Sequence, residues 1–190
     1  MNTSFFFKKV SMVLFLSLLI IVYLTLSCKN NNSINKENII KNFIGKTIDL
    51  PDSLLLLKNN KIDTINIDRY NSDIQIISFI DGRCKVCVNK LLSLIEAKRR
   101  LNKEVTNVPE YLFIVYSENY NYFMEKFYPL LNHSQPILLL SDISFLEQKQ
   151  LPGLGSYKTF LTINDTIRVV GNPSGNKELT NLYKKVINKH

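Results

Sequence analysis

The sequence has 190 residues, of which 24 are Lys or Arg and 16 are Asp or Glu, so its formal net charge is +8. This length excludes two ordinary domains once an exported leader is set aside, and it favours one α/β or α+β domain. The basic residues do not interleave with aromatic residues in any nucleic-acid motif. We therefore interpret the charge as a lysine-rich solvated surface and expect no nucleic-acid partner.

Residues 1–27 have the order of a secretory signal: two lysines, then the uncharged run Val10–Leu26, then Cys28. The segment is similar to a bacterial lipoprotein signal. That resemblance implies cleavage before Cys28, lipidation of Cys28, and anchoring in the cell envelope at the inner or the outer membrane. The run is also long enough to be an uncleaved membrane anchor. Both interpretations predict that the rest of the chain is exported.

The polar, Asn-rich residues 28–37 are predicted to form a flexible tether, and residues 38–190 a single domain. Within the domain, Gly45–Asp52 reads as a short strand ended by a proline. Leu54–Leu57 and Asp63–Ile67 follow as a pair of strands joined by a turn.

The segment Asp73–Ile80 is apolar and β-branched, as expected for a buried central strand. From Cys84 to Leu101 the apolar residues recur at helical spacing, which predicts an amphipathic helix. The remaining predicted elements are a strand at Tyr111–Tyr116, a helix at Glu118–Leu131, a short strand at Pro136–Leu140, a loop containing Pro152, Gly153 and Gly155, a hairpin of Thr159–Ile163 and Thr166–Val170 around Asn164–Asp165, and a helix at Lys177–Ile187.

The candidate chemistry lies in Cys84 and Cys87, which open the helix that follows the central strand. Unsatisfied N–H groups and the helix dipole at that end favour a thiolate, the attacking species in disulfide exchange. We expect Cys84 to be the nucleophile and Cys87, one turn later, the resolving thiol. Arg83 and Lys85 are expected to add to the stabilisation of the thiolate. Asp81 precedes the turn, either as a proton shuttle or as a turn-forming residue.

Two other interpretations of the cysteine pair remain open: a permanent structural disulfide, which export permits, or a relic on a fold now used for binding. A structural zinc site usually needs four Cys or His ligands. The pair would have to recruit both His133 and His190, so we expect no metal.

The segment Ile76–Cys87 resembles the strand and redox turn of thioredoxin-fold proteins, in particular membrane-tethered redoxins of the TlpA type. Gly45–Pro51 is similar to the N-terminal entry of such domains, and Tyr157–Ile163 to their Pro-Thr-Thr-Phe-Leu-type strand. The resemblance implies a central mixed β-sheet flanked by helices, with the cysteine pair at the start of the first helix. It also implies a thiol–disulfide oxidoreductase without a cofactor, which exchanges with protein thiols or disulfides and takes electrons from a donor protein.

Two positions depart from the family pattern. Arg83 stands where the family has Trp, and Tyr157 stands where the family has a cis-proline facing the cysteines. A cis bond before a non-proline residue costs about 3 kcal/mol, so the bond to Tyr157 is predicted to be trans. Arg83, Tyr157 and Lys158 are the candidate substrate-groove residues. The departures favour the alternative function, a non-catalytic lipoprotein that binds a protein or peptide and has a fixed Cys84–Cys87 disulfide.

Overall fold

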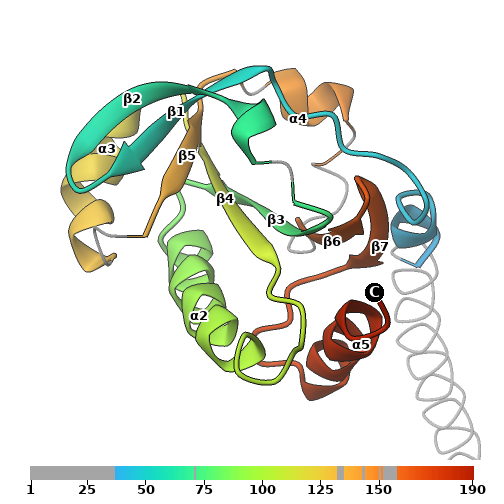
Figure 1. The fold of residues 1–190 in the computed structure, drawn as a ribbon. Coiled ribbons are helices and arrows are strands. Elements are labelled where there is room, and N and C mark those ends of the chain that lie inside the picture. Colours follow the sequence, from blue (N-terminus) through green and yellow to red (C-terminus); the bar gives the residue numbers. More distant parts are fainter. Residues whose placement is uncertain (1–36, 71, 132–134, 143, 150, 152–157) are drawn as a thin grey trace, which may run out of the picture. The chain divides into compact units, whose positions relative to one another are not determined.

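The computed structural model describes residues 37–70, 72–131, 135–142, 144–149, 151 and 158–190. The chain divides into two compact units, one up to Lys41 and one from Asn42 to His190. Of the first unit, the structure describes a helical segment at residues 37–41, in which Lys41 and Glu37 form an ion pair of 2.8 Å across one turn. The second unit carries the sheet and the remaining helices (Figure 1).

Seven strands in the described part of the chain form one mixed sheet with the order β2-β1-β5-β4-β3-β6-β7. β3 runs parallel to β4 and antiparallel to β6, and β4 runs parallel to β5. The strands are β1 (Ser53–Lys58), β2 (Lys61–Asn66), β3 (Ile74–Asp81), β4 (Glu110–Tyr116), β5 (Ile137–Leu140), β6 (Thr159–Ile163) and β7 (Thr166–Val170).

Two tight hairpins join neighbouring antiparallel strands. Asn59 and Asn60 connect β1 to β2, and Asn164 and Asp165 connect β6 to β7. All four residues have positive φ, between 48° and 62°. Two left-handed residues in succession define the type I′ turn, whose twist matches that of the flanking strands, and Asn and Asp tolerate this conformation better than most residues. The predicted hairpin at Asn164–Asp165 is confirmed.

The helices beyond residue 41 are interspersed with the strands along the chain. They are α2 (Lys85–Leu101), α3 (Tyr120–Lys126), α4 (Ser144–Gln148) and α5 (Lys177–Ile187), with short 3-10 turns at η1 (Ile67–Arg69) and η2 (Tyr128–Leu130). The basic residues Lys98, Arg99 and Arg100 lie in the last turn of α2. Their positive charges interact favourably with the negative end of the helix dipole.

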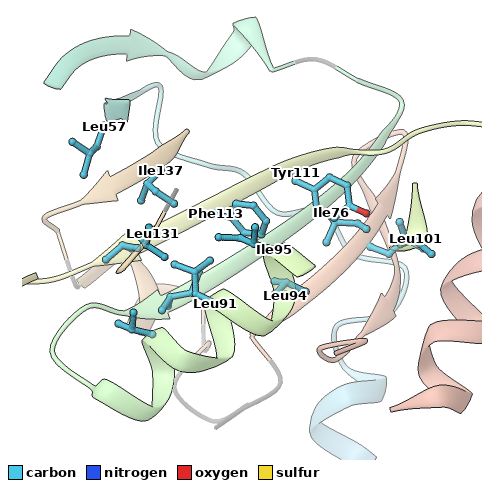
Figure 2. Packing of buried hydrophobic residues seen from close by; sticks show 14 of the residues in the cluster. Leu57, Ile76, Leu91, Leu94, Ile95, Leu101, Tyr111, Phe113, Leu131 and Ile137 are labelled. Carbon is cyan, nitrogen blue, oxygen red and sulfur yellow. The ribbon is translucent and has the colours of Figure 1, made fainter. Parts of the chain in front are cut away.

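The main core lies between one face of the sheet and helices α2, α3 and α5 (Figure 2). From α2, Val88, Leu91, Leu94 and Ile95 turn toward the sheet because they share one helical face. The strands contribute residues at alternate positions, among them Ile76, Phe113, Ile137 and Leu161. On the opposite face, the ring of Phe79 packs against Phe145 of α4 and Phe160 of β6, with ring centroids 6.1 and 6.3 Å apart.

Two predicted elements need correction, and one helix was not predicted. Gly45–Asp52 is not a strand: Gly45 has φ +84°, and Thr47 forms only an isolated bridge to Thr166. The helix expected at Glu118–Leu131 is shorter in the structure and spans only α3 (Tyr120–Lys126). Pro129 ends it, because proline lacks an N–H donor and its ring would clash with a continuing helix. The chain forms the 3-10 turn η2 at this point instead. Helix α4 was not predicted, since five residues are too few for a helical period to be visible.

In the described part of the chain, no helix is long and apolar enough to cross a membrane. The predicted leader with Cys28, as well as His133, Pro152, Gly153, Gly155 and Tyr157, lies outside the described residues.

Candidate functional site

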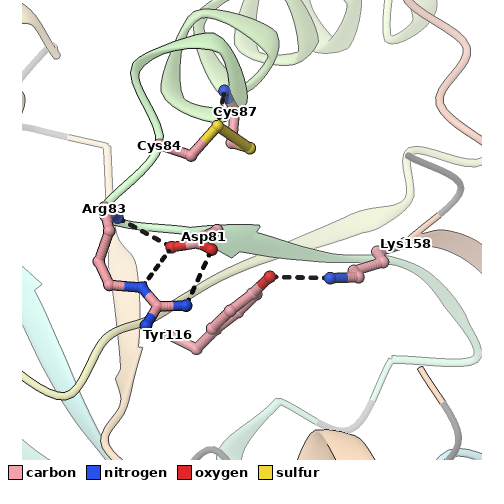
Figure 3. Close-up of a disulfide and its surroundings, with 6 residues drawn as sticks. All are labelled: Asp81, Arg83, Cys84, Cys87, Tyr116 and Lys158. Atoms are coloured by element: carbon pink, nitrogen blue, oxygen red, sulfur yellow. Dashed lines mark hydrogen bonds and ion pairs between the residues drawn. A yellow bond between two sulfur atoms is a disulfide. The ribbon is translucent and has the colours of Figure 1, made fainter. Parts of the chain in front are cut away.

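The cysteine pair lies beyond the C-terminal end of the central strand. β3 ends at Asp81, the chain turns through Gly82 and Arg83, and Cys84 caps α2. The structure joins Cys84 and Cys87 in a disulfide, with their Cα atoms 5.1 Å apart (Figure 3). The C-terminal ends of the inner strands of an open α/β sheet are where ligands and chemistry usually lie.

The helix start directs a backbone donor at the first sulfur. Cys84 has extended backbone angles, its carbonyl accepts the first helical hydrogen bond from Val88 at 3.0 Å, and its Sγ accepts a hydrogen bond from the N–H of Cys87 at 3.2 Å. Cys84 therefore occupies the N-cap position, in which a side chain normally satisfies one of the free N–H groups of the first turn. Cys87 is half-buried and packs against the main core.

Gly82 allows the turn to approach the sheet closely. Its N–H donates to the carbonyl of Tyr116 at 3.0 Å. A Cβ atom at this position would lie 2.8 Å from Cγ1 of Val115 and 3.4 Å from the Tyr116 carbonyl oxygen. Real Cβ atoms essentially never approach other atoms that closely, so a side chain here would displace the turn from β4.

Asp81 and Arg83 form a clamp across the same turn. The Asp81 carboxylate accepts 3.1 Å hydrogen bonds from Nε and Nη2 of Arg83 and a 2.9 Å hydrogen bond from the backbone N–H of Arg83. Burial by itself would raise the pKa of Asp81, but the hydrogen bonds and charge of Arg83, with a smaller contribution from Lys158, hold this pKa below its ordinary value. Asp81 thus forms the turn, one of the two roles considered for it.

The clamp directs the Arg83 guanidinium toward Asp81 and away from the sulfur atoms in Figure 3. A second carboxylate, that of Glu118, lies 4.0 Å from Nη1 of Arg83. The positive charge of Arg83 is therefore already compensated, and its expected contribution to thiolate stabilisation is correspondingly reduced.

Lys158 and Tyr116 approach the site from two further strands. Tyr116 ends β4 in register with Asp81, and Lys158 directly precedes β6. The Nζ atom of Lys158 donates a 2.8 Å hydrogen bond to the hydroxyl of Tyr116 and lies 5.0 Å from the centroid of its ring. The backbone of Lys158 is also held in place, because its carbonyl accepts a hydrogen bond of 2.9 Å from the N–H of Phe79 on β3.

A cavity of about 70 Å³ lies beside Cys87. The polar residues Asp81, Lys90, Tyr116 and Lys158 line it. Ser78 and Thr159 also line it, and their hydroxyls are joined by a hydrogen bond of 3.1 Å. Lys90 reaches this cavity because it follows Cys87 by three residues on the same helical face.

The structure thus brings Arg83, Lys158 and the cysteine pair together at one edge of the sheet, whereas Tyr157 lies outside the described residues. Sequence reasoning missed Tyr116 and Lys90. Tyr116 was predicted only as the last residue of a strand. The relevant signal was that parallel strands end at the same sheet edge, so the last residues of β3 and β4 become neighbours. In the described ranges, no group of three or more His, Cys, Asp or Glu residues is arranged to hold a metal ion.

No protein-family model matches the sequence, and no curated protein sequence is similar to it. Solved structures do resemble the domain. A protein from Bacteroides thetaiotaomicron proposed to be a protein disulfide isomerase has a TM-score of 0.52 at 16% identity, over 77% of this chain and 91% of its own.

Two further structures are comparably similar. A protein from Chlorobium tepidum proposed to be the thiol:disulfide interchange protein DsbE has a TM-score of 0.51 at 9% identity, over 75% of this chain and 96% of its own. AhpC of Enterococcus faecalis has a TM-score of 0.50 at 10% identity, over 78% and 95% of the two chains. The expected thioredoxin-like fold is confirmed: a mixed sheet with flanking helices and a Cys84–Cys87 disulfide near the start of α2.

Proposed function

We propose that this thioredoxin-like domain is a thiol–disulfide oxidoreductase that works through Cys84 and Cys87. The observation that carries the proposal is the position of Cys84 as the N-cap of α2, with its Sγ accepting the N–H of Cys87 at 3.2 Å. A hydrogen bond to an ionised acceptor is stronger than one to a neutral acceptor. The helix start therefore favours the thiolate of reduced Cys84 over its thiol.

The proposed reaction transfers two electrons between dithiol and disulfide. The Cys84 thiolate attacks one sulfur of a partner disulfide, forms a mixed disulfide and displaces the partner's other sulfur as a thiolate. Cys87 then loses its proton and attacks Cys84 Sγ, which forms the Cys84–Cys87 bond and releases the second partner thiolate. The partner gains two electrons and the domain is oxidised. Run in reverse, the same steps oxidise a partner dithiol.

The surroundings of the two sulfurs support this division of roles. Cys87 packs against the main core, whereas Lys85 and Val86, the residues between the cysteines, are exposed, Val86 at 63%. A partner polypeptide can therefore approach at the start of α2 and reach Cys84 without displacing core residues. The chemistry requires no cofactor, and we propose that a second protein resets the oxidation state of the pair.

We further propose that the domain acts in the cell envelope. The support is the leader at residues 1–27 and the position of Cys28 where its apolar run ends, as in lipoprotein signals. In this proposal residues 28–37 tether the domain to a lipid anchor on the inner or the outer membrane.

The test is the pH dependence of alkylation of the reduced full-length protein carrying Cys28→Ser, so that only the pair reacts. We expect reduced Cys84 to titrate well below the free-thiol pKa of about 8.5, and Cys87 to react more slowly. Cys84→Ser, which removes the nucleophile, and Cys87→Ser, which should accumulate mixed disulfides, assign the two signals. A Cys84 pKa at or above the free-thiol value contradicts the proposal.

One observation favours the alternative, a binding module with a fixed disulfide: Asp81 and Glu118 compensate the charge of Arg83 next to the nucleophile. The reduction potential separates the two functions. Structural disulfides usually lie below about −300 mV and exchange-active ones above that value.

A further inference from the structure

The charges around the disulfide are unequally compensated. Lys85 and Lys90 on α2 and Lys158 before β6 bring three ammonium groups to the redox end of the domain, together with the guanidinium of Arg83. Among the described residues, the acidic groups at this end that form ion pairs are Asp81 and Glu118, and both pair with Arg83. None of the three lysines forms an ion pair with a described residue.

Lys158 is held in place by contacts that do not involve a carboxylate. Its Nζ donates to the Tyr116 hydroxyl at 2.8 Å, a neutral acceptor, while its carbonyl binds the N–H of Phe79. Its influence on Asp81 is a longer-range attraction, and the Asp81 oxygens are already used by Arg83. An ammonium group positioned in this way retains donors for an incoming anion, because Lys carries three N–H bonds.

Lys90 and Lys158 border the same small cavity as Cys87, one from the helix side and one from the strand side. The apolar residues Ile80, Leu91 and Leu94, which belong to the main core or its side of the sheet, also line the cavity. A group that suits this site has a short apolar stem and an anionic end. Both features occur in the side chains of Glu and Asp.

We propose that the thiol–disulfide partner of this domain is a polypeptide whose reactive cysteine is flanked by acidic residues, and that Lys90 and Lys158 select it. This inference rests on the proposed function and adds the class of substrate. A carboxylate of the partner binds between the two ammonium groups beside Cys87, which places the partner's sulfur over the disulfide. Lys85, exposed between the cysteines, adds to the attraction at longer range.

The experiment uses the oxidised full-length protein carrying Cys28→Ser and three matched heptapeptides. Each peptide has one central cysteine, flanked on both sides by Glu, Gln or Lys. The rate of Cys84–Cys87 reduction by each peptide is divided by that peptide's rate with hydroxyethyl disulfide, because flanking charges also alter the reactivity of the peptide thiol itself.

We expect the Glu peptide to react roughly threefold or more faster than the Gln peptide, and the Gln peptide faster than the Lys peptide, at low salt. In 1 M salt, where the Debye length is about 3 Å, the ratios should contract toward one. Lys90→Glu and Lys158→Glu should each reduce or reverse the order. Lys158→Gln removes the charge but keeps a polar side chain that can donate a hydrogen bond. It therefore shows whether an effect of Lys158→Glu comes from the charge or from a folding defect caused by the loss of the Tyr116 contact.

Lys61→Glu is the matched control: Lys61 is exposed on β2 at the far edge of the sheet, and its reversal changes the net charge equally without altering the site. Equal normalised rates for the three peptides, or ratios that Lys90→Glu and Lys158→Glu leave unchanged, overturn the inference but leave the oxidoreductase intact. Failure of all three peptides to reduce the disulfide contradicts the proposed function itself.

Discussion

The Asp81 carboxylate accepts three hydrogen bonds from Arg83: two of 3.1 Å from the guanidinium and one of 2.9 Å from the backbone N–H. Both residues precede Cys84 by three positions or fewer. The clamp therefore fixes the shape of the turn before α2 and also sets how much positive charge surrounds Cys84, the proposed nucleophile.

Asp81→Asn should lower the pKa of reduced Cys84. The amide can still accept the backbone N–H of Arg83, so the turn is kept, but a negative charge is removed and the guanidinium is released. We expect a decrease of roughly half a pKa unit, the size typical of one nearby charge screened by solvent. The pH dependence of iodoacetamide alkylation measures it. Asp63→Asn on β2, far from the cysteines, makes the same change in net charge and should have no effect. An increase in the Cys84 pKa would mean that Asp81 acts mainly on the turn.

The clamp also predicts a dependence of stability on pH. Because the pKa of Asp81 is lower in the folded protein than in the unfolded chain, its stabilisation is present above the unfolded pKa of about 4 and is lost as the pH falls through the folded value. Arg83→Gln should therefore reduce the free energy of unfolding near neutral pH, by at most about 1 kcal/mol for a pair this exposed.

Urea denaturation of the wild type and of Arg83→Gln at several pH values tests this. The difference between the two proteins should disappear at acidic pH. Lys126→Gln, which removes a lysine that forms no ion pair among the described residues, should show no such trend. A difference that is independent of pH would exclude the ion pair as its source.

Gly82→Ala should destabilise the domain and displace the redox turn, because the new methyl would lie 2.8 Å from Cγ1 of Val115. Overpacking of this kind typically costs about 1–3 kcal/mol. In the Gly82→Ala, Val115→Ala double variant the obstructing atom is gone, so the two changes should cost less together than the sum of the single changes. A thermodynamic cycle from urea denaturation measures this coupling. Strict additivity would show that the turn does not meet Val115.

Tyr183→Phe should weaken the docking of α5. Tyr183 is fully buried, and its hydroxyl donates a 2.8 Å hydrogen bond to the carbonyl of Gly171 after β7. Removing the hydroxyl leaves that acceptor unpaired, at a cost of about 1–2 kcal/mol in the free energy of unfolding. Tyr122→Phe on the exposed side of α3 should change stability little. Equal effects of the two substitutions would contradict the role given to the Gly171 contact.

Helices and strands could be predicted from the sequence where a single local pattern, such as alternation or helical periodicity, defines the element. The hairpin strands β6 and β7 and helix α5 have the predicted bounds, since alternation, the Asn-Asp turn and helical periodicity each leave little choice there. β3 was displaced by one residue, because Asp81 is polar and yet continues the pairing with Tyr116. α4 could not be predicted, since its two buried residues, Phe145 and Leu146, make no periodic pattern.

The site was predictable only in part, for a similar reason. The spacing of Cys84 and Cys87 and the strand before them are visible in the sequence. The bond from Lys158 to Tyr116 joins residues 42 positions apart and depends on the placement of β4 and β6 on either side of β3. The Arg83 side chain could extend into solvent or fold back onto the Asp81 carboxylate. The sequence alone does not determine which of these two conformations it adopts.

The disulfide closes a very short stretch of chain, since its cysteines are three positions apart. A cross-link over so few residues removes little freedom from the unfolded chain, about 2 kcal/mol in the chain-entropy description, whereas a domain of this size typically has 5–15 kcal/mol of stability. The sheet and its core involve residues far from the pair in sequence, and they do not depend on it for closure. Oxidation and reduction of the pair are therefore expected to leave the fold of the domain unchanged.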